Sequence, residues 1–520
     1  MSSDLPPRPP GPAGPGRPSG VRRSGPDLTT GPIGRTLILF ALPVLGSNIL
    51  QSLNGSANAV WVSHVLGEAA LTATSNANQI FFLLLGSVFG ISMAANIMIG
   101  QAVGAEDEAL AKRVVGASTT FFIVLSLIVG GLGLWLTPAI LTAMHTPPDA
   151  QVDAIIYLRV IFAAMPFVYF FSFVQMAQRG VGDSRTPFYF SLLAVGLDVL
   201  LNPLLIMGVG PFPKMGIAGS ATSTLISQTF TLGVMLVHLY RTNSLLVLRP
   251  HEWRLLAPDF KIIRGLVLKG LPMAFQMMVI SLAAVTMMSM VNGYGSHTAA
   301  AYGAALQLWT YVQMPAMALG AAVSSMAAQN VGAGKMERVE KVAGVGIAYS
   351  FLMTATPVLV IYLADPFILR AFLPAASPSL PIAVHINSIV LWGFIPFGVA
   401  FIFSGVVRST GAVWPPLAAM IVALWGVRVP LANLLAPHLG ADAIWISFPI
   451  GSLTTCALAG AYYRWGGWRT ARMLDDSPHG EAPDTGMGPP SLVEESEAAA
   501  EVSRSSRAAP NRPRSGAAAE

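Results

Sequence analysis

An aspartate and an asparagine are spaced to share one face of an apolar helix in the stretch 188–209, FYFSLLAVGLDVLLNPLLIMGV. Asp198 and Asn202 are four residues apart, so their side chains lie one helical turn apart on the same side. The stretch has about the 20 residues that a helix needs to cross a bilayer. An unpaired charge at that depth costs roughly 3 kcal/mol or more, so the acid predicts a functional site. Two roles are open for Asp198: titration or cation binding, and a permanently protonated structural hydrogen bond.

The composition indicates a polytopic membrane protein. Of the 520 residues, 53% are hydrophobic and 11% are charged, and the mean hydropathy is +0.62. Soluble domains carry about 25% charged residues. The single cysteine, Cys456, excludes disulfides and cysteine-built metal sites, and we expect no metal and no organic cofactor. We expect the net charge of +5 to reflect orientation in the membrane and not nucleic-acid binding.

Twelve apolar segments are long enough to span a bilayer. They lie near 37–62, 72–99, 114–137, 154–177, 188–209, 217–239, 265–291, 299–327, 342–363, 384–407, 414–436 and 443–464. The loops after the even-numbered segments are rich in Lys and Arg, whereas those after the odd-numbered segments hold only Lys214 and Arg370. Because positive charge stays on the cytoplasmic side, we expect a multi-pass protein of the cell (inner) membrane with both termini in the cytoplasm.

The chain also repeats itself. The clearest pair is QAVGAEDEALAKRVVG at 101–116 and QNVGAGKMERVEKVAG at 329–344, and Pro43 recurs as Pro272 at nearly the same offset. Each half holds six spans, an even number, so both halves enter the membrane in the same direction. This pattern predicts parallel repeats with a cavity between them.

We therefore expect an all-α polytopic membrane protein with twelve transmembrane helices in two six-helix lobes, related by a parallel pseudo-twofold repeat. The expected N-terminal lobe covers 33–240, an interlobe loop covers 241–264, and the C-terminal lobe covers 265–470. The Pro- and Gly-rich stretch 1–32 and the polar stretch 471–520 are expected to be disordered tails, because neither can bury enough apolar surface to fold.

The loop RGVGDSRTP at 179–187 carries a family resemblance. Together with the Leu-Pro opening of spans 1 and 7 and the Gln-x-Val-Gly-Ala loop after spans 2 and 8, it resembles the multidrug and toxic compound extrusion (MATE) family of cation-coupled antiporters. The resemblance covers about residues 33–470 and implies export of organic, often cationic and amphipathic compounds in exchange for protons or sodium ions. We expect a monomer with the bilayer and small organic substrates as partners, protons favoured over sodium, and the 179–187 loop as a structural clasp.

The polar cluster that the family carries in its N-terminal lobe is altered at two positions. The span 1 pattern that ends in Asp in the family here runs from Gln51 to Asn58, and the span 5 pattern Asn-x-x-x-Asp-Pro is reversed to Asp198-x-x-x-Asn202-Pro203. One carboxylate remains where two are often found. The residues expected to couple the cation are Asp198, Asn202 and Asn58, and those expected to complete a polar cluster are Gln51, Asn54 and Thr224.

The second lobe offers no equivalent acid. The repeat aligns Trp425 with Asp198, which argues against a sodium site there. Arg428 is a basic residue inside a span, and we favour a structural role over a functional one because the sequence offers no nearby acid. The alternative function is a flippase for lipid-linked glycan or other lipid-like cargo, although such a cleft would need several Arg or Lys. An enzyme is not expected, because the spans hold no clustered acids and no Ser/His pair.

Overall fold

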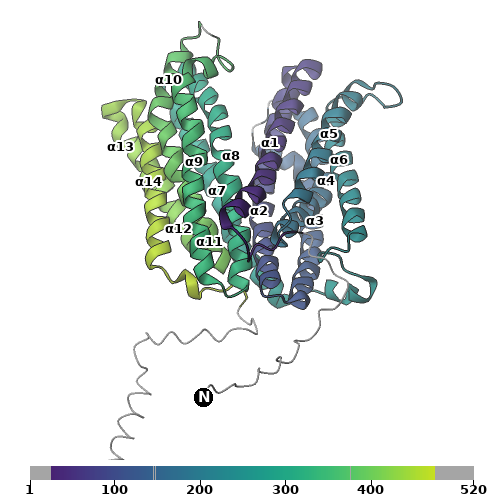
Figure 1. Ribbon diagram of the computed structural model, residues 1–520. Helices are drawn as coiled ribbons and strands as arrows, with labels where there is room; N and C mark the ends of the chain where they lie inside the picture. Colours follow the sequence, from purple (N-terminus) through teal and green to yellow (C-terminus); the bar gives the residue numbers. More distant parts are fainter. Residues whose placement is uncertain (1–24, 145, 147, 375, 475–520) are drawn as a thin grey trace, which may run out of the picture. The chain divides into compact units, whose positions relative to one another are not determined.

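The computed structural model describes residues 25–474, apart from 145, 147 and 375, and within that range the chain is all-helical (Figure 1). The first half contains α1 (Ile33–Leu66), α2 (Glu68–Gly104), α3 (Glu108–Ala143), α4 (Pro148–Gly180), α5 (Arg185–Met207), α6 (Ile217–Arg241) and the short 3₁₀ helix η1 (Pro250–Leu256). The second half contains α7 (Phe260–Asn292), α8 (Ser296–Gly332), α9 (Met336–Leu369), α10 (Ser379–Val390), α11 (Phe394–Thr410), α12 (Trp414–Ile421), α13 (Val429–Leu439), α14 (Asp442–Trp465) and the 3₁₀ helix η4 (Gly467–Thr470).

These helices form the twelve spans that the sequence predicts. A 3₁₀ turn, η2 (Leu391–Gly393), joins α10 to α11, and a π-helical turn, η3 (Val422–Arg428), joins α12 to α13, so each pair is one span. Within the described residues, eleven spans are long and apolar enough to cross a membrane, and α8 is not among them. The reason lies in its side chains: α8 carries Gln307, Thr310 and Gln313 where it lines cavities. These three polar side chains lower the mean hydropathy of α8.

The two halves form two lobes, and several helices of one lobe contact helices of the other, among them α2 with α8. Within the first lobe, α4 packs against α2, α3 and α6, and α5 packs against α1 and α6; within the second, α8, α9 and α14 surround α11. The first helix of each half also reaches across: α1 contacts α8 and α9, and α7 contacts α2 and α3. These crossings are related by the sequence repeat, and they give the packing the internal symmetry that the repeat predicts.

Part of each expected disordered tail packs against the helices. Within the N-terminal stretch 1–32, Leu28 is fully buried, and its carbonyl accepts a hydrogen bond from the side-chain amide of Asn330 at 3.1 Å. At the other end Met473 is buried and lies against Gly265. Residues 25–32 and 471–474 therefore pack against the lobes. The rest of the predicted tails, 1–24 and 475–520, lies outside the described residues.

The loop between the lobes is ordered by two ion pairs with α3. Lys112 Nζ lies 2.5 Å from Glu252 Oε1, and Arg113 Nη2 lies 2.6 Å from Asp259 Oδ2. Burial raises the pKa of Glu252, but the hydrogen bond from Lys112 and other favourable contacts bring it below its usual value. The hydrogen bond from Arg113 likewise lowers the pKa of Asp259. Both carboxylates therefore stay ionised and hold η1 and the start of α7 against α3.

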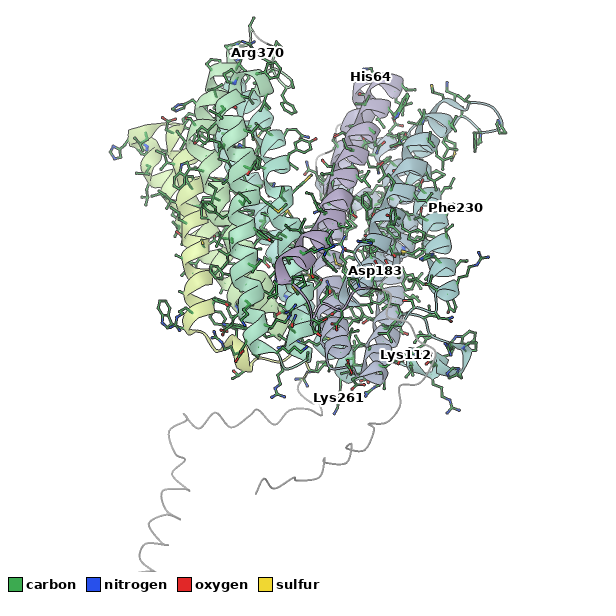
Figure 2. The ribbon with its side chains drawn as sticks, in the orientation of Figure 1. His64, Lys112, Asp183, Phe230, Lys261 and Arg370 are labelled. Atoms are coloured by element: carbon green, nitrogen blue, oxygen red, sulfur yellow. The ribbon has the colours of Figure 1, made fainter. Side chains whose placement is uncertain are left out.

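The two ends of the helix bundle differ in charge. Lys112 and Lys261 lie at one end, here called the basic end, and His64 and Arg370 lie at the opposite end (Figure 2). Helices α2, α4, α6, α8 and α11 all end toward the basic end, and most of the Lys and Arg of the connections between spans lie near these helix ends. The structure thus gathers at a single end the loops that the sequence groups by charge.

Candidate functional site

A cavity of about 630 Å³ lies between the two lobes and has Asp198 in its wall. Helices α1, α2, α4, α5 and α6 of the first lobe form most of it, and Gln307, Thr310 and Met314 of α8 close the other side. Its volume is within the range of about 300–1,000 Å³ that holds small organic ligands. We call it the acid cavity, since Asp198 is the one acidic residue among those that line it.

Asp198 is buried, with 4% of its surface exposed, and it is surrounded by neutral donors. Asn54 Nδ2 of α1 donates to its Oδ2 at 2.8 Å, and Ser223 Oγ of α6 lies 2.5 Å from its Oδ1. Thr224 Oγ1 lies 3.3 Å from both oxygens. Within the described part of the chain, no basic side chain forms an ion pair with this carboxylate. Its charge, when present, is held by hydrogen bonds alone.

A second polar group lies one turn further along α5. Asn202 Nδ2 donates to Asn58 Oδ1 at 2.9 Å, and Ser220 Oγ donates to the same oxygen at 2.6 Å. Asn58 Nδ2 lies 3.4 Å from the hydroxyl of the buried Tyr157 on α4. Asn202 Oδ1 is buried and has no hydrogen-bonding partner among the described residues. A buried acceptor left without a donor costs about 1–3 kcal/mol. Asn202 Oδ1 is therefore the atom of this group best able to accept a hydrogen bond from a ligand.

The hydroxyl of Ser223 fits both charge states of Asp198. Besides its contact with the carboxylate, Ser223 Oγ lies 2.8 Å from the backbone carbonyl of Ser220. A hydroxyl has one proton to donate and free lone pairs to accept with. When Asp198 is ionised, Ser223 donates to it; when Asp198 is protonated, the acid donates to Ser223 and Ser223 donates to the Ser220 carbonyl. Either state leaves these groups satisfied, so a proton can leave or enter without rearrangement of the helices.

The structure unites five of the six polar residues predicted for this lobe, but in a different pairing. Asn54, assigned to the surrounding cluster, bonds directly to Asp198, whereas Asn58, assigned to the acid, bonds to Asn202. Gln51 lines the same cavity and is exposed, without a hydrogen bond to this cluster. The cluster is thus two adjacent hydrogen-bonded groups, one around the acid and one around the amides.

Sequence reasoning missed Ser220, Ser223 and Tyr157. A signal for the two serines was present: buried hydroxyl residues recur along one face of α6 at the helical period. They are Ser220, Ser223, Ser227 and Thr231. Tyr157 gave no such signal, because its contact with Asn58 joins residues of helices that are not adjacent in sequence.

The buried charge of the second lobe lies in a cavity of its own. Arg428 lines a space of about 540 Å³ among α7, α8, α11, α14 and η3, here called the arginine cavity. The prediction that no acid lies nearby agrees with the geometry: among the described residues Arg428 forms no ion pair, and its guanidinium carbon lies 4.6 Å from the ring centroid of Phe448. Gln307 and Thr310 belong to the walls of both cavities.

At the basic end the lobes meet through a symmetric pair of hydrogen bonds. Gln101 Nε2 donates to the Ser409 carbonyl at 2.6 Å, and Gln329 Nε2 donates to the Gly180 carbonyl at 2.8 Å. The two glutamines are the first residues of the repeated QxVGA loops. The 179–187 loop also acts locally, because Asp183 caps α5 through the backbone amides of Arg185 and Thr186, each at 3.0 Å. These contacts hold this end of the structure closed.

Comparison with known proteins decides the family. The sequence profile of the MatE family matches residues 43–204 and 272–434, the two halves of the repeat. The chain belongs to the MATE family. Its relatives include the probable multidrug resistance proteins YoeA and YpnP of Bacillus subtilis, which are 36% and 31% identical to it. The alignment with YoeA covers 83% of this chain and 94% of the relative, and that with YpnP covers 86% and 99%.

Solved MATE structures confirm the fold. An outward-facing multidrug resistance MATE transporter of the MOP superfamily superposes with a TM-score of 0.78 at 20% identity, over 86% of this chain and 98% of the other. The resemblance, the all-α two-lobe fold and the transporter class predicted from the sequence are therefore confirmed. This MATE protein is a multi-pass membrane transporter and not an enzyme.

Proposed function

We propose that this MATE transporter is a proton-coupled antiporter that exports organic, often cationic and amphipathic compounds by alternating access. One observation carries the proposal: a buried carboxylate with no basic partner among the described residues lines the cavity between the lobes, beside a serine hydroxyl that also contacts a backbone carbonyl. A proton needs only such a carboxylate, whereas a sodium ion needs several oxygen ligands. The two hydroxyls beside Asp198, of Ser223 and Thr224, are in place as hydrogen-bond donors to the carboxylate, and the Asn54 contact is also a donor.

Coupling requires that proton and substrate favour different states, because a ligand that binds two states equally shifts nothing. In this site the two compete for one group. An organic cation is attracted to Asp198 only while the carboxylate is ionised, and a proton removes that attraction. Proton entry from one side therefore promotes release of a cationic substrate on the same side.

The direction follows from the charge of the loops. Positive loops stay in the cytoplasm, so the basic end faces the cytoplasm and both ends of the chain lie on that side. The glutamine contacts at the basic end then form a closed cytoplasmic gate, and in this conformation the acid cavity exchanges with the outside. Transport needs the second conformation, in which that gate is open.

The flippase alternative finds little support in the cavity walls. Recognition of a lipid-linked pyrophosphate calls for several Arg or Lys side chains. Of the residues that line the acid and arginine cavities, only Arg428 is basic. A single basic side chain can bind one small anionic group, but it cannot bind a pyrophosphate headgroup along a path across the membrane.

The test is ethidium transport by purified protein in proteoliposomes, driven by a proton gradient or by a sodium gradient. We expect transport under the proton gradient alone, and we expect Asp198→Asn to reduce it to the level of empty liposomes. Asp365→Asn is the matched control, since Asp365 is also a buried acid and bonds to Asn387 Nδ2 at 2.7 Å in the other lobe. Wild-type transport rates with Asp198→Asn would refute the proposed role of Asp198 in coupling. Transport driven by the sodium gradient alone would refute the proposal that protons are the coupling ion.

A further inference from the structure

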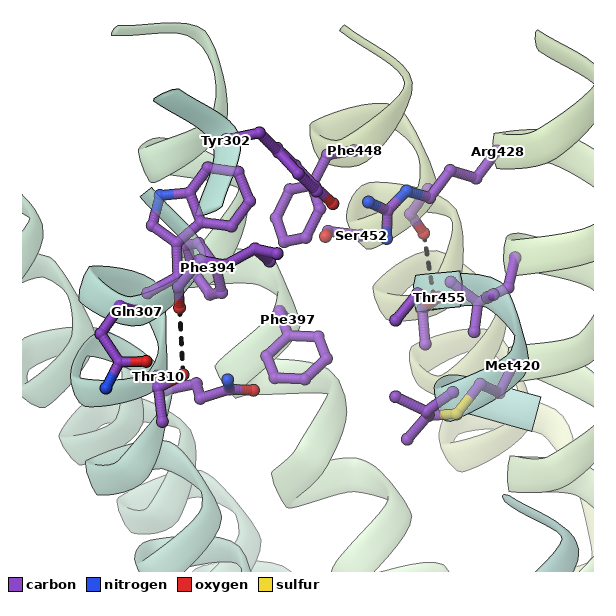
Figure 3. A pocket seen from close by; sticks show the side chains of 18 of the residues that line it. Tyr302, Gln307, Thr310, Phe394, Phe397, Met420, Arg428, Phe448, Ser452 and Thr455 are labelled. Carbon is purple, nitrogen blue, oxygen red and sulfur yellow. Dashed lines mark hydrogen bonds between the residues drawn. The ribbon is translucent and has the colours of Figure 1, made fainter. Parts of the chain in front are cut away.

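The arginine cavity contains a charge that the protein leaves without a counterion. Burying a guanidinium costs several kcal/mol unless it is paired. Within the described residues, Arg428 interacts with two neutral groups, the hydroxyl of Tyr302 and the face of Phe448, and its Nε is buried without a hydrogen-bonding partner. Figure 3 shows the guanidinium directed from η3 toward Tyr302 and Phe448, into the cavity. A negative group is the partner that this charge lacks.

The backbone that carries Arg428 is built differently from the rest of the span. Arg428 is the last residue of η3, the single π-helical turn among the described elements. π-Helical turns are rare and are frequent at functional sites. Here the turn ends at the one basic side chain of the cavity. The helix distortion and the unpartnered charge are independent observations that coincide at one residue.

The walls specify what kind of molecule carries the negative group. Four aromatic side chains surround the space in Figure 3: Tyr302, Phe394, Phe397 and Phe448. Trp309 also lines the cavity, with its ring centroid 5.8 Å from that of Phe394. Ring faces bind other flat rings at small cost in conformational entropy. Aliphatic, hydroxyl and amide side chains complete the wall, and no carboxylate lines it.

We propose that the arginine cavity binds aromatic anions: the carboxylate, sulfonate or phosphate of a substrate pairs with Arg428 and its ring packs among the aromatic walls. This inference rests on the proposed transport function and names a substrate class for it. A planar guanidinium suits two parallel hydrogen bonds to such a group. The cavity volume of about 540 Å³ accommodates a molecule of two or three fused rings. The two lobes thus offer sites of opposite charge that share Gln307 and Thr310.

The test measures binding without transport, by titration calorimetry on the full chain in lipid nanodiscs with empty nanodiscs as the blank. The probes are 2-naphthoate and 2-naphthylmethylammonium, which have the same ring and opposite charge. We expect Arg428→Gln to weaken 2-naphthoate binding at least about ten-fold, as expected for loss of a charge-assisted bond. Arg428→Lys keeps the charge but not the planar fork, so it should bind 2-naphthoate more tightly than Arg428→Gln and less tightly than the wild type. Arg370→Gln, which removes an exposed basic side chain that lines neither cavity, should leave 2-naphthoate binding unchanged.

Three outcomes would overturn the proposal. They are absence of 2-naphthoate binding to the wild type, equal binding by Arg428→Gln, and equal weakening of both probes by that variant. A variant that elutes as a single species on size exclusion is taken as folded. If Arg428→Gln does not fold, the affinity of Arg428→Lys for 2-naphthoate is compared with that of the wild type. No ion gradient enters the assay, so failure of proton coupling leaves this result intact, and failure here leaves the coupling test intact.

Discussion

The glutamine pair at the basic end should control the balance between the two conformations of the transporter. Gln101 and Gln329 each donate a hydrogen bond from one lobe to the other, and Gln329 is 1% exposed. A hydrogen bond of this kind contributes about 1 kcal/mol net. Each Gln→Ala substitution should therefore shift the equilibrium about five-fold toward the state in which this end is open. The two bonds are separate, so their effects should add, and the double variant should shift it about 30-fold.

The backbone at the same place allows a stronger perturbation. A Cβ on Gly104 would overlap the carbonyl oxygen of Gln329, and a Cβ on Gly332 would overlap that of Gln101. Both obstacles are backbone atoms of the opposite lobe, so the lobes must separate to relieve them. Gly104→Ala should therefore favour the open state more than either glutamine variant. Gly344→Ala is the matched control, because nothing lies within 4 Å of a Cβ there.

The assay is the rate of maleimide labelling at Ser325→Cys, in protein whose Cys456 is replaced by serine. Ser325 is fully buried between the lobes, where Asn96 Nδ2 lies 3.3 Å from its Oγ. Its labelling rate should rise with the population of the open state. The control is Gln151→Ala, which removes a glutamine near the start of α4, at the opposite end of that helix from Gly180. It should leave the labelling rate unchanged. Labelling rates in the double glutamine variant and in Gly104→Ala within two-fold of the parent would refute this account of the gate.

Two further predictions concern stability. The pKa values of Glu252 and Asp259 lie below their usual range in the folded protein, so their ion pairs stabilise it above about pH 4 and lose this effect as the pH falls through the folded pKa values. The protection factors of the backbone amides in residues 250–262, which are corrected for the intrinsic pH dependence of hydrogen exchange, should therefore fall below pH 4. Lys112→Met should reduce that fall, and protection factors that do not change with pH would contradict the prediction. In the second lobe, Trp309 Nε1 donates to Asn387 Oδ1 at 2.9 Å. Trp309→Phe should lower the Tm by leaving a buried acceptor unpaired, at a cost of about 1–3 kcal/mol, and an unchanged Tm would show that the bond contributes nothing.

Sequence reasoning predicted the spans because apolar length is a local property. The stretch 188–209 became α5, Arg185–Met207, and the one-turn spacing of Asp198 and Asn202 put both side chains on one face. The same reasoning could not predict which asparagine of α1 bonds to Asp198. Asn54 and Asn58 also lie one turn apart on one face, so a shift of α1 by one turn along α5 would exchange their roles. The axial position of one helix against another depends on packing along their whole lengths.

The π-helical turn at Arg428 was also beyond a sequence prediction. Residues 414–436 read as an ordinary apolar segment, and nothing in their periodicity marks the wider turn. The sequence predicts that Arg428 has no acid nearby, and among the described residues it forms no ion pair. It could not show that the side chain enters a cavity with aromatic walls, because those walls come from α8, α11 and α14. The expectation of a purely structural role rested on the missing partner, and in the structure the missing partner is the reason to propose a ligand.

The sequence repeat is retained where the two lobes contact each other and is lost in the walls of the two cavities. Gln101 matches Gln329 and Gly104 matches Gly332, and each pair makes the same contact in both directions. Lobes that rock about a shared axis must fit each other at the closed end, so a change in one copy of that contact disturbs the other. The cavities carry no such constraint, and they differ in sign: an acid in one lobe, a guanidinium in the other. A duplicated scaffold can therefore keep one gating motion while its two halves select opposite charges.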